Sequence, residues 1–251
     1  MKHSYSLSFA FVLFLSLFNN LPTHASDYLK EVILANDLYS EKKYMESAQA
    51  YEALIQKGVH NGYLFYNLGN TYIRMGNKGA AILNYIRAQK LIPRDENLGA
   101  NLRFAIQQTQ DKIEPPPPGT LATLFFWSSN FNLSELINLT MVLNFIFWVN
   151  LALWMFFRSP TLKIARNTLL CFLLLSFISI GVKLINISGS ELGVVLAKRV
   201  EVRSGRAMDA ITLFQLHEGA LVTITGDHEN WLEVRLNDEQ KGWVPKTSIG
   251  T

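Results

Sequence analysis

The residues best suited to catalysis or metal binding are few in this sequence, and they do not cluster. The single cysteine, Cys171, lies inside a long apolar run, and no histidine has a second metal ligand at a usable spacing. The histidines are His3, His24, His60, His217 and His228. The sequence also has no phosphate-binding glycine loop and no nucleophile elbow, and its acidic pairs at 95–96 and 238–239 are interpreted as solvated turns. We therefore expect no enzyme, no catalytic residue, no metal and no cofactor.

Two apolar segments in the middle of the chain have the length of membrane-spanning helices. Residues 134–157 and 167–187 are each roughly 20 residues long and rich in Leu, Ile and Phe, as a ~30 Å hydrocarbon core requires. Residues 158–166 between them carry three positive charges and no negative one. The positive-inside rule places this loop in the cytoplasm. Within the first segment, Asn144 lies one turn after Thr140 and is expected to bond a neighbouring helix of this chain or of a partner.

The N-terminus has the three parts of a secretory signal. Lys2 precedes an apolar stretch, and small residues lead to a cleavage position after Ala25, so residues 1–25 are predicted to be a signal peptide. An uncleaved anchor is the alternative, but about a dozen apolar residues extend only ~18 Å as a helix. The signal and the loop charges independently predict a multi-pass protein of a bacterial inner (cytoplasmic) membrane, with both soluble domains periplasmic.

The net charge of +3 comes from basic residues that flank the apolar runs. Residues 27–114 hold eleven Lys or Arg against ten Asp or Glu, and residues 189–251 hold seven against nine. Neither soluble part is basic, so we expect the lipid bilayer as a partner and no nucleic acid.

Residues 27–110 repeat with a period of 34, which is the period of tetratricopeptide repeats. Leu34 recurs as Leu68, Asn36 as Asn70, Ser47 as Ala81 and Tyr51 as Tyr85. The second copy resembles that family's pattern at nearly every defining position: Gly69 and Ala81 permit close helix approach, Gly76 and Asn77 make the turn, and Pro93 ends the second helix. The sequence thus predicts an all-α tetratricopeptide-repeat domain with a capping helix at about 97–109.

One helix face of the second repeat carries polar and aromatic side chains at spacings of three and four. These are Tyr63, Tyr66, Asn70 and Arg74, and the repeat adds Asn36. On the concave face of such a domain they are predicted to bind a partner as an extended peptide or a C-terminal carboxylate. The alternative is that the tyrosines pack on the next helix and Asn70 bonds locally.

Residues 111–120 are predicted to be a proline-rich linker. Four consecutive prolines, 115–118, favour an extended conformation of about 3.1 Å per residue and are interpreted as a stiff spacer. A proline-motif ligand for a partner domain is the alternative. Residues 121–127 are expected to lie along the membrane surface, with Trp127 at headgroup depth.

Residues 192–251 alternate between apolar and polar side chains as five short strands. The expected strands are 194–202, 211–216, 220–225, 231–236 and 242–244. Four motifs, at 202–205, 216–219, 231–234 and 242–245, stand in the order and spacing of a bacterial SH3-like domain, so an all-β SH3-like barrel is predicted. Its candidate partner contacts are Arg203, Arg206, Trp231 and Trp243, and a structural role in the core or a shared surface pocket is the alternative for both tryptophans.

The multidomain order of signal, repeats, two transmembrane helices and terminal barrel resembles the BatE-type proteins of bacterial aerotolerance operons. The resemblance covers nearly the whole chain and depends on the run 66–70, residues 91–95 and the barrel motifs. It implies a non-catalytic scaffold or adaptor that assembles with membrane-bound von Willebrand-type Bat proteins and a MoxR-type ATPase, in stress tolerance or envelope protein maturation. A membrane anchor that binds cell-wall peptidoglycan is the alternative. A cell-wall hydrolase would need a catalytic domain for which no residues remain.

Overall fold

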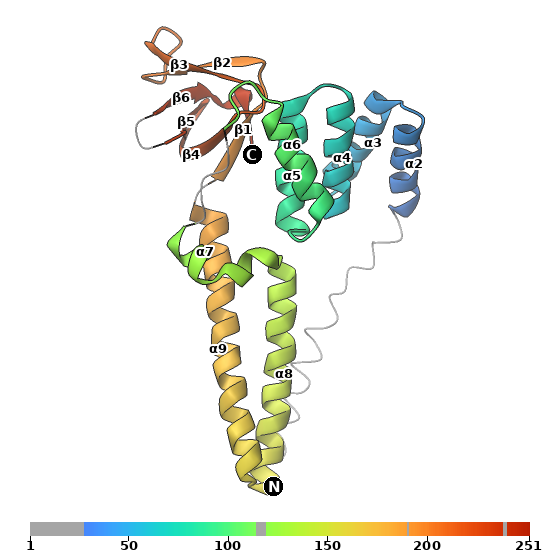
Figure 1. Cartoon of the computed structure of the whole chain (residues 1–251), viewed down its shortest axis with the longest axis vertical. Coiled ribbons are helices and arrows are strands. Elements are labelled where there is room, and N and C mark those ends of the chain that lie inside the picture. The colour runs from blue at the N-terminus through green and yellow to red at the C-terminus, as the bar shows by residue number, and fades with distance from the viewer. Residues whose placement is uncertain (1–27, 114–118, 190, 238–239) are drawn as a thin grey trace. The chain divides into compact units, whose positions relative to one another are not determined.

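The computed structural model describes residues 28–113, 119–189, 191–237 and 240–251 (Figure 1). Helices come first in these residues, two long apolar helices follow, and strands form the C-terminal part, in the expected order. The chain divides into two compact units, Met1–Gly58 and Val59–Thr251. The predicted signal peptide and the four consecutive prolines lie outside the described residues.

The described part of the first unit is a pair of packed helices, α2 (Leu29–Ser40) and α3 (Tyr44–Gln56). Lys42, in the turn between them, has a left-handed backbone at φ 64°. The helices meet at Ala35, which is fully buried and whose carbonyl accepts a 2.9 Å hydrogen bond from Ser47 Oγ. Small residues at both positions allow this approach.

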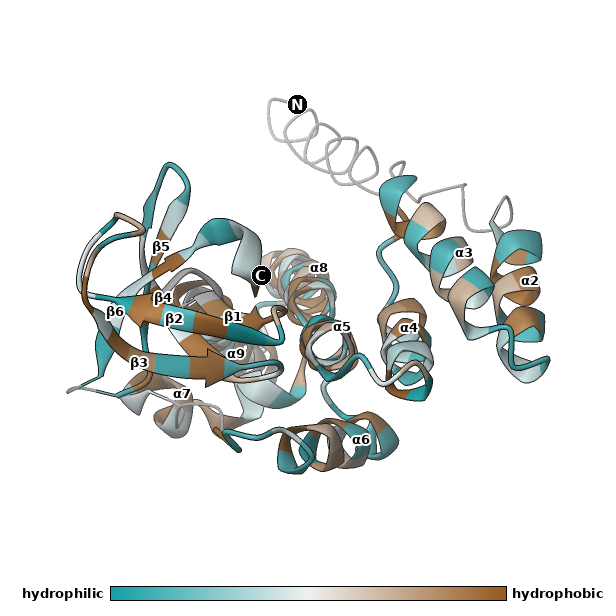
Figure 2. Ribbon diagram, turned by 90° about the horizontal axis from the view of Figure 1, so that it is seen from above, coloured by the Kyte–Doolittle hydropathy of each residue, from teal (hydrophilic) through white to brown (hydrophobic). Residues whose placement is uncertain are grey.

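Three helices open the second unit: α4 (Gly62–Arg74), α5 (Lys78–Leu91) and α6 (Glu96–Gln107). Teal and brown alternate around α4 and α6 in Figure 2, as expected of helices that bury one face and expose the other. The turn between α4 and α5 contains Gly76 at φ 75°, and α5 ends before Pro93, so the expected turn and helix end are both confirmed.

A polar side chain caps the start of each of these three helices. Asn61 accepts from the amide of Tyr63, Asn77 from Ala80 and Asp95 from Leu98. Asp95, expected in a solvated turn, is therefore the N-cap of α6, and the following Glu96 lies in the first helical turn, where the helix dipole favours an acid.

The 34-residue repeat is also visible in side-chain hydrogen bonds. In the first unit Tyr51 donates its hydroxyl to Asn36 Oδ1 at 2.5 Å, and in the second unit Tyr85 donates to Asn70 Oδ1 at 2.7 Å. A Cβ added at Gly69 would lie 2.5 Å from the Tyr85 ring, so only glycine fits where α4 crosses α5. Each unit therefore contains one copy of the same helix-pair geometry.

Two long apolar helices follow a short α7 (Thr120–Leu124) and a 3-10 turn, η2 (Phe126–Asn130). They are α8 (Leu133–Phe157) and α9 (Pro160–Gly189), and both are long and apolar enough to cross a membrane. Only Arg158 and Ser159 separate them, whereas we expected a loop at 158–166. The reason is that proline at the first position starts a helix readily and nothing after it interrupts one.

The two helices pack on each other as a hairpin, and side-chain bonds tie its open end together. Trp127 Nε1, ahead of α8, donates to Ser179 Oγ near the end of α9 at 3.1 Å. Lys183 Nζ donates to the carbonyl of Ser128 at 3.2 Å. At the other end, Arg158 and Arg166 lie over the Trp154 ring, at 5.2 and 4.5 Å from its centroid.

The C-terminal part is a seven-stranded antiparallel sheet of order β3-β2-β6-β5-β4-β1-β7, here called the β-domain. Its strands are β1 (Glu191–Val195), β2 (Arg199–Arg203), β3 (Thr212–His217), β4 (Leu221–His228), β5 (Trp231–Arg235), β6 (Lys241–Pro245) and β7 (Ile249–Gly250). The first expected strand, 194–202, is two strands, because the chain turns at 196–198, where Leu196 N bonds to the carbonyl of Ser248.

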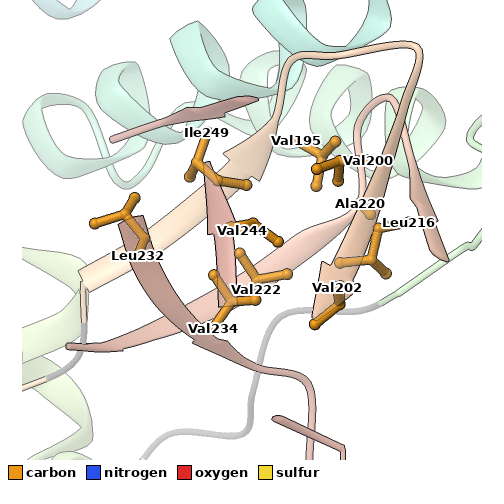
Figure 3. Packing of buried hydrophobic residues seen from close by; sticks show 10 residues of the cluster. All are labelled: Val195, Val200, Val202, Leu216, Ala220, Val222, Leu232, Val234, Val244 and Ile249. Atoms are coloured by element: carbon orange, nitrogen blue, oxygen red, sulfur yellow. The ribbon is translucent and has the colours of Figure 1, made fainter. Parts of the chain in front are cut away.

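Alternate residues of these strands form one apolar core. Figure 3 shows ten of them converging: Val195, Val200, Val202, Leu216, Ala220, Val222, Leu232, Val234, Val244 and Ile249. Neither tryptophan of the predicted barrel belongs to this cluster, and both are half-buried. Strand periodicity explains this, since Trp231 and Trp243 alternate with buried Leu232 and Val244 and so lie on the other face of the sheet.

Candidate functional site

The predicted residues of the second repeat lie together on α4. Tyr63 is 57% exposed, Tyr66 is half-buried with its ring centroid 6.0 Å from that of Tyr85, and Arg74 is exposed in the last turn. The α4 face therefore presents one open aromatic ring and one cation, with a second ring partly packed on α5.

Asn70 is the centre of a hydrogen-bond network that joins three helices. Its Oδ1 accepts from Tyr85 Oη on α5 at 2.7 Å and from Asn101 Nδ2 on α6 at 2.9 Å. Asn101 Nδ2 also donates to Tyr66 Oη at 3.1 Å. Asn70 thus orients Tyr66 and Asn101, and these bonds are the local contacts that the sequence left open as an alternative to partner binding.

Asn36 lies on α2 in the first unit, where its Oδ1 accepts from Tyr51 Oη at 2.5 Å. The predicted set is therefore divided between the two units, with Asn36 in one and Tyr63, Tyr66, Asn70 and Arg74 in the other.

Two residues of α6 extend the α4 face, and sequence reasoning missed both. Asn101 belongs to the network above, and Phe104, one turn further along the same helix, is 57% exposed. The sequence did contain a signal for Phe104: helical periodicity places it outside the buried stripe of Leu98, Leu102 and Ala105, which implies an exposed ring. The α4–α6 face, defined as Tyr63, Tyr66, Asn70, Asn101 and Phe104, combines open aromatic rings with hydroxyl and amide groups, which is chemistry suited to an extended peptide.

In the β-domain, Trp243 lies on the outer face of the sheet between two cationic or ionisable side chains. Arg206 Cζ is 5.4 Å from the Trp243 ring centroid, and the His228 ring meets Trp243 edge to face at 5.3 Å. Arg203 and Glu233 are its cross-strand neighbours. His228 was not among the predicted contacts, since only the pairing of β4 with β5 and of β5 with β6 brings it beside Trp243.

Arg203, predicted to contact a partner, makes hydrogen bonds and an ion pair within the β-domain. Its side chain is 15% exposed; Nη1 donates to the carbonyls of Met208 and Ala210, and Nη2 pairs with Glu201 at 2.7 Å. Arg203 therefore positions the loop between β2 and β3. That loop carries Arg206 to Trp243 and leaves Met208 69% exposed.

Trp231 lies at the start of β5, in register with His228 on β4 and Pro245 on β6. The structure thus places Trp231 and Trp243 on neighbouring strands, with Arg206 and His228 beside Trp243. We call Arg206, His228, Trp231 and Trp243 the tryptophan face.

Among the described residues, no group of three His, Cys, Asp or Glu side chains has the arrangement of a metal site. Cys171 is exposed on α9. Comparison with models of known protein families gave no match, and comparison with curated proteins gave none either.

Proposed function

We propose that this chain is a non-catalytic scaffold or adaptor of a bacterial inner membrane, which holds two protein-binding modules on the periplasmic side. In this proposal the helices α2–α6 are a tetratricopeptide-repeat domain and the β-domain is a bacterial SH3-like domain. The hairpin of α8 and α9 is its membrane anchor.

The observation that carries the proposal is the α4–α6 face. Tyr63 and Phe104 are each 57% exposed, although burying an aromatic ring is among the most favourable contacts a folded chain can make. Interfaces between proteins are enriched in such rings beside hydrogen-bonding groups, and the Asn70 network holds Tyr66 and Asn101 in place to provide them.

The hairpin supports placing both modules on one side of the membrane. The bonds from Trp127 to Ser179 and from Lys183 to Ser128 join the start of α8 to the end of α9, so a membrane crossed by both helices leaves the segments before and after them together. Arg158, Lys163 and Arg166 lie at the other end, where the positive-inside rule expects the cytoplasm.

The resemblance to BatE-type proteins suggests the partners: membrane-bound von Willebrand-type Bat proteins in an aerotolerance or envelope-stress complex. Peptidoglycan binding by a wall anchor is the second candidate. The tryptophan face favours this candidate, because the half-buried indole of Trp243, with Arg206 and His228 beside it, offers a ring on which a wall peptide or sugar could stack.

The test is co-purification of the full chain with a membrane-bound von Willebrand-type protein encoded beside it. Tyr63→Ala combined with Phe104→Ala should reduce recovery at least tenfold, since both rings are exposed and their loss leaves the helices folded. Met45→Ala, at an apolar side chain that is 66% exposed in the first unit, is the matched control and should have no effect.

Two outcomes would contradict the scaffold proposal. One is equal recovery of the partner by the double variant and the control, with unchanged circular dichroism. The other is sedimentation of the full chain with peptidoglycan sacculi that resists high salt and is abolished by Trp243→Ala, which would favour the wall anchor.

A further inference from the structure

Helix α5 is buried around its whole circumference. Six successive residues, 81–86, are buried, whereas a helix that covers a single face buries residues at spacings of three and four. Its neighbours within the second unit are α4, α6 and strand β1 of the β-domain. One face of α5 therefore packs on the β-domain.

Three glycines lie where these two parts meet, and none of them has room for a side chain. A Cβ at Gly79 would be 2.7 Å from the carbonyl oxygen of Val195 on β1. A Cβ at Gly219 would be 2.6 Å from Thr109 Cγ2, and one at Gly250 would be 2.5 Å from Leu83 Cδ2. The two parts are thus in close contact at three separate points: backbone against backbone at Gly79, and backbone against the side chains of Thr109 and Leu83 at the other two glycines.

Hydrogen bonds between the two parts satisfy groups that would otherwise lie unpaired. The amide of Gly79, in the first turn of α5, has no acceptor within its own helix and donates to Glu218 Oε1 at 3.1 Å. Glu218 also pairs with Lys198, and its side chain is only 11% exposed. A carboxylate at a helix N-terminus is favoured by the helix dipole as well.

Asp111 makes the second polar contact. One carboxylate oxygen accepts from the backbone amide of His217 at 2.7 Å, and the other lies 2.9 Å from Nδ1 of the same histidine. Ile113 packs against the β-domain core two residues later. Residues 111–113, predicted to be the start of a linker, are therefore part of the contact.

Arg87 adds a third contact, donating from Nη2 to the carbonyl of Thr251. Burial lowers the pKa of the Arg87 guanidinium, and Tyr72 acts in the opposite direction. Arginine side chains stay protonated in proteins, so a charged guanidinium makes this contact.

We propose that α4–α6 and the β-domain form one rigid body held by this α5–β-domain interface, so that the connecting chain is not needed to keep them together. The β-domain edge formed by β1, β7 and the turn 217–219 is then a binding surface whose ligand is the chain's own α5. Partners bound at the α4–α6 face and at the tryptophan face are held at one fixed separation.

The test cuts the chain between the two parts. In the full chain, a protease site replaces residues 115–118 and an affinity tag is inserted at residue 26, behind a signal sequence of known processing that replaces residues 1–25. The protein is purified in detergent and cut, the tagged helical fragment is captured, and the membrane-plus-β-domain fragment that stays bound is measured.

The fragments should stay together in the parent chain. Gly79→Ala combined with Asp111→Ala should reduce retention at least tenfold, equivalent to about 1.4 kcal/mol of binding free energy. Gly99→Ala is the matched control: it is also a helical glycine, and its Cβ would meet only the far end of Arg103 at 3.4 Å. Gly79→Ala and Gly99→Ala each replace a helical glycine by a better helix former, so a difference in retention between the double variant and the control cannot come from lost helix propensity.

The helical fragment also contacts the membrane fragment outside the α5–β-domain interface: Arg94 pairs with Glu135, at the start of α8, at 2.6 Å. A separate variant measures how much this ion pair contributes to retention. Arg94→Ala alone should leave most of the fragment bound. Three results would each overturn the proposal. The cut parent chain could dissociate, or the double variant could be retained as well as the parent. The third is release by Arg94→Ala as large as that of the double variant. If the double variant shows reduced helical circular dichroism, Asp111→Asn is used in its place. The amide has the size of the carboxylate but one acceptor oxygen fewer, so retention should fall several-fold.

Discussion

Gly69 is the residue whose side-chain size is most tightly constrained in the helical repeat. The atoms that a Cβ would meet are the ring of Tyr85 and the carbonyl oxygen of Ala81, at 2.5 and 3.2 Å, and neither is the end of a flexible side chain. Tyr85 is itself fixed by its bond to Asn70. Strain at Gly69 is therefore transmitted directly to the network that orients Tyr66.

Gly69→Ala should lower the free energy of unfolding by about 1–3 kcal/mol, which is the usual cost of overpacking a well-packed site. Thermal unfolding of the full chain in detergent, followed by helical circular dichroism, measures the change. Gly99→Ala should be neutral or slightly stabilising. An equal effect of the two substitutions would show that α4 and α5 do not cross as closely as described.

Asn150 is a second residue with a specific energetic consequence. Its Oδ1 is buried and has no hydrogen-bond partner among the described residues, although it lies in the apolar helix α8. The polar residue singled out from the sequence was Asn144, because Thr140 precedes it by one turn. Thr140 instead donates to the carbonyl of Leu136 in its own helix at 2.8 Å.

At the scale of the element, Asn150→Leu should stabilise the hairpin, because it removes a buried acceptor that lacks a donor and conserves volume. We expect a higher midpoint of unfolding in a denaturing-detergent titration. Asn138→Leu changes an exposed asparagine of the same helix and should shift the midpoint less. A lower midpoint for Asn150→Leu would mean that its amide has an essential partner.

The elements also show what sequence reasoning can and cannot provide. The 34-residue period, Gly76, Asn77 and Pro93 specify the helix pair locally, so its turn and its end were predicted correctly. The division of 194–202 into β1 and β2 was missed because no glycine or proline marks the turn, which depends on a bond from Leu196 to distant Ser248.

The candidate site residues show the same contrast between local sequence signals and contacts that depend on tertiary structure. Spacing along one helix placed Tyr63, Tyr66 and Asn70 on a common face, as periodicity requires. Asn101 and His228 were missed, because they reach the α4–α6 face and Trp243 only through tertiary packing and strand pairing. The bonds of Arg203 to Glu201 and to the carbonyls of the β2–β3 loop were likewise missed, because they form only in the folded sheet.

At the scale of the whole molecule, the proposed topology makes a prediction about three positions. Alkaline phosphatase is active only outside the cytoplasm, so fusions after Asp111 and after Thr251 should be active and a fusion at Leu162 inactive. The reason is that three basic residues and no acidic residue lie within 158–166. Activity at Leu162 with inactivity at the other two positions would reverse the orientation.

The two-residue connection between α8 and α9 has a consequence for how the chain is made. Arg158 and Ser159 extend at most ~7 Å, far less than the ~30 Å that one crossing requires. In the proposed topology, this connection leaves α9 no room to move away from α8. We therefore expect the two helices to enter the bilayer as a pair, and a charge introduced into α9 should reduce the amount of chain whose C-terminus reaches the periplasm.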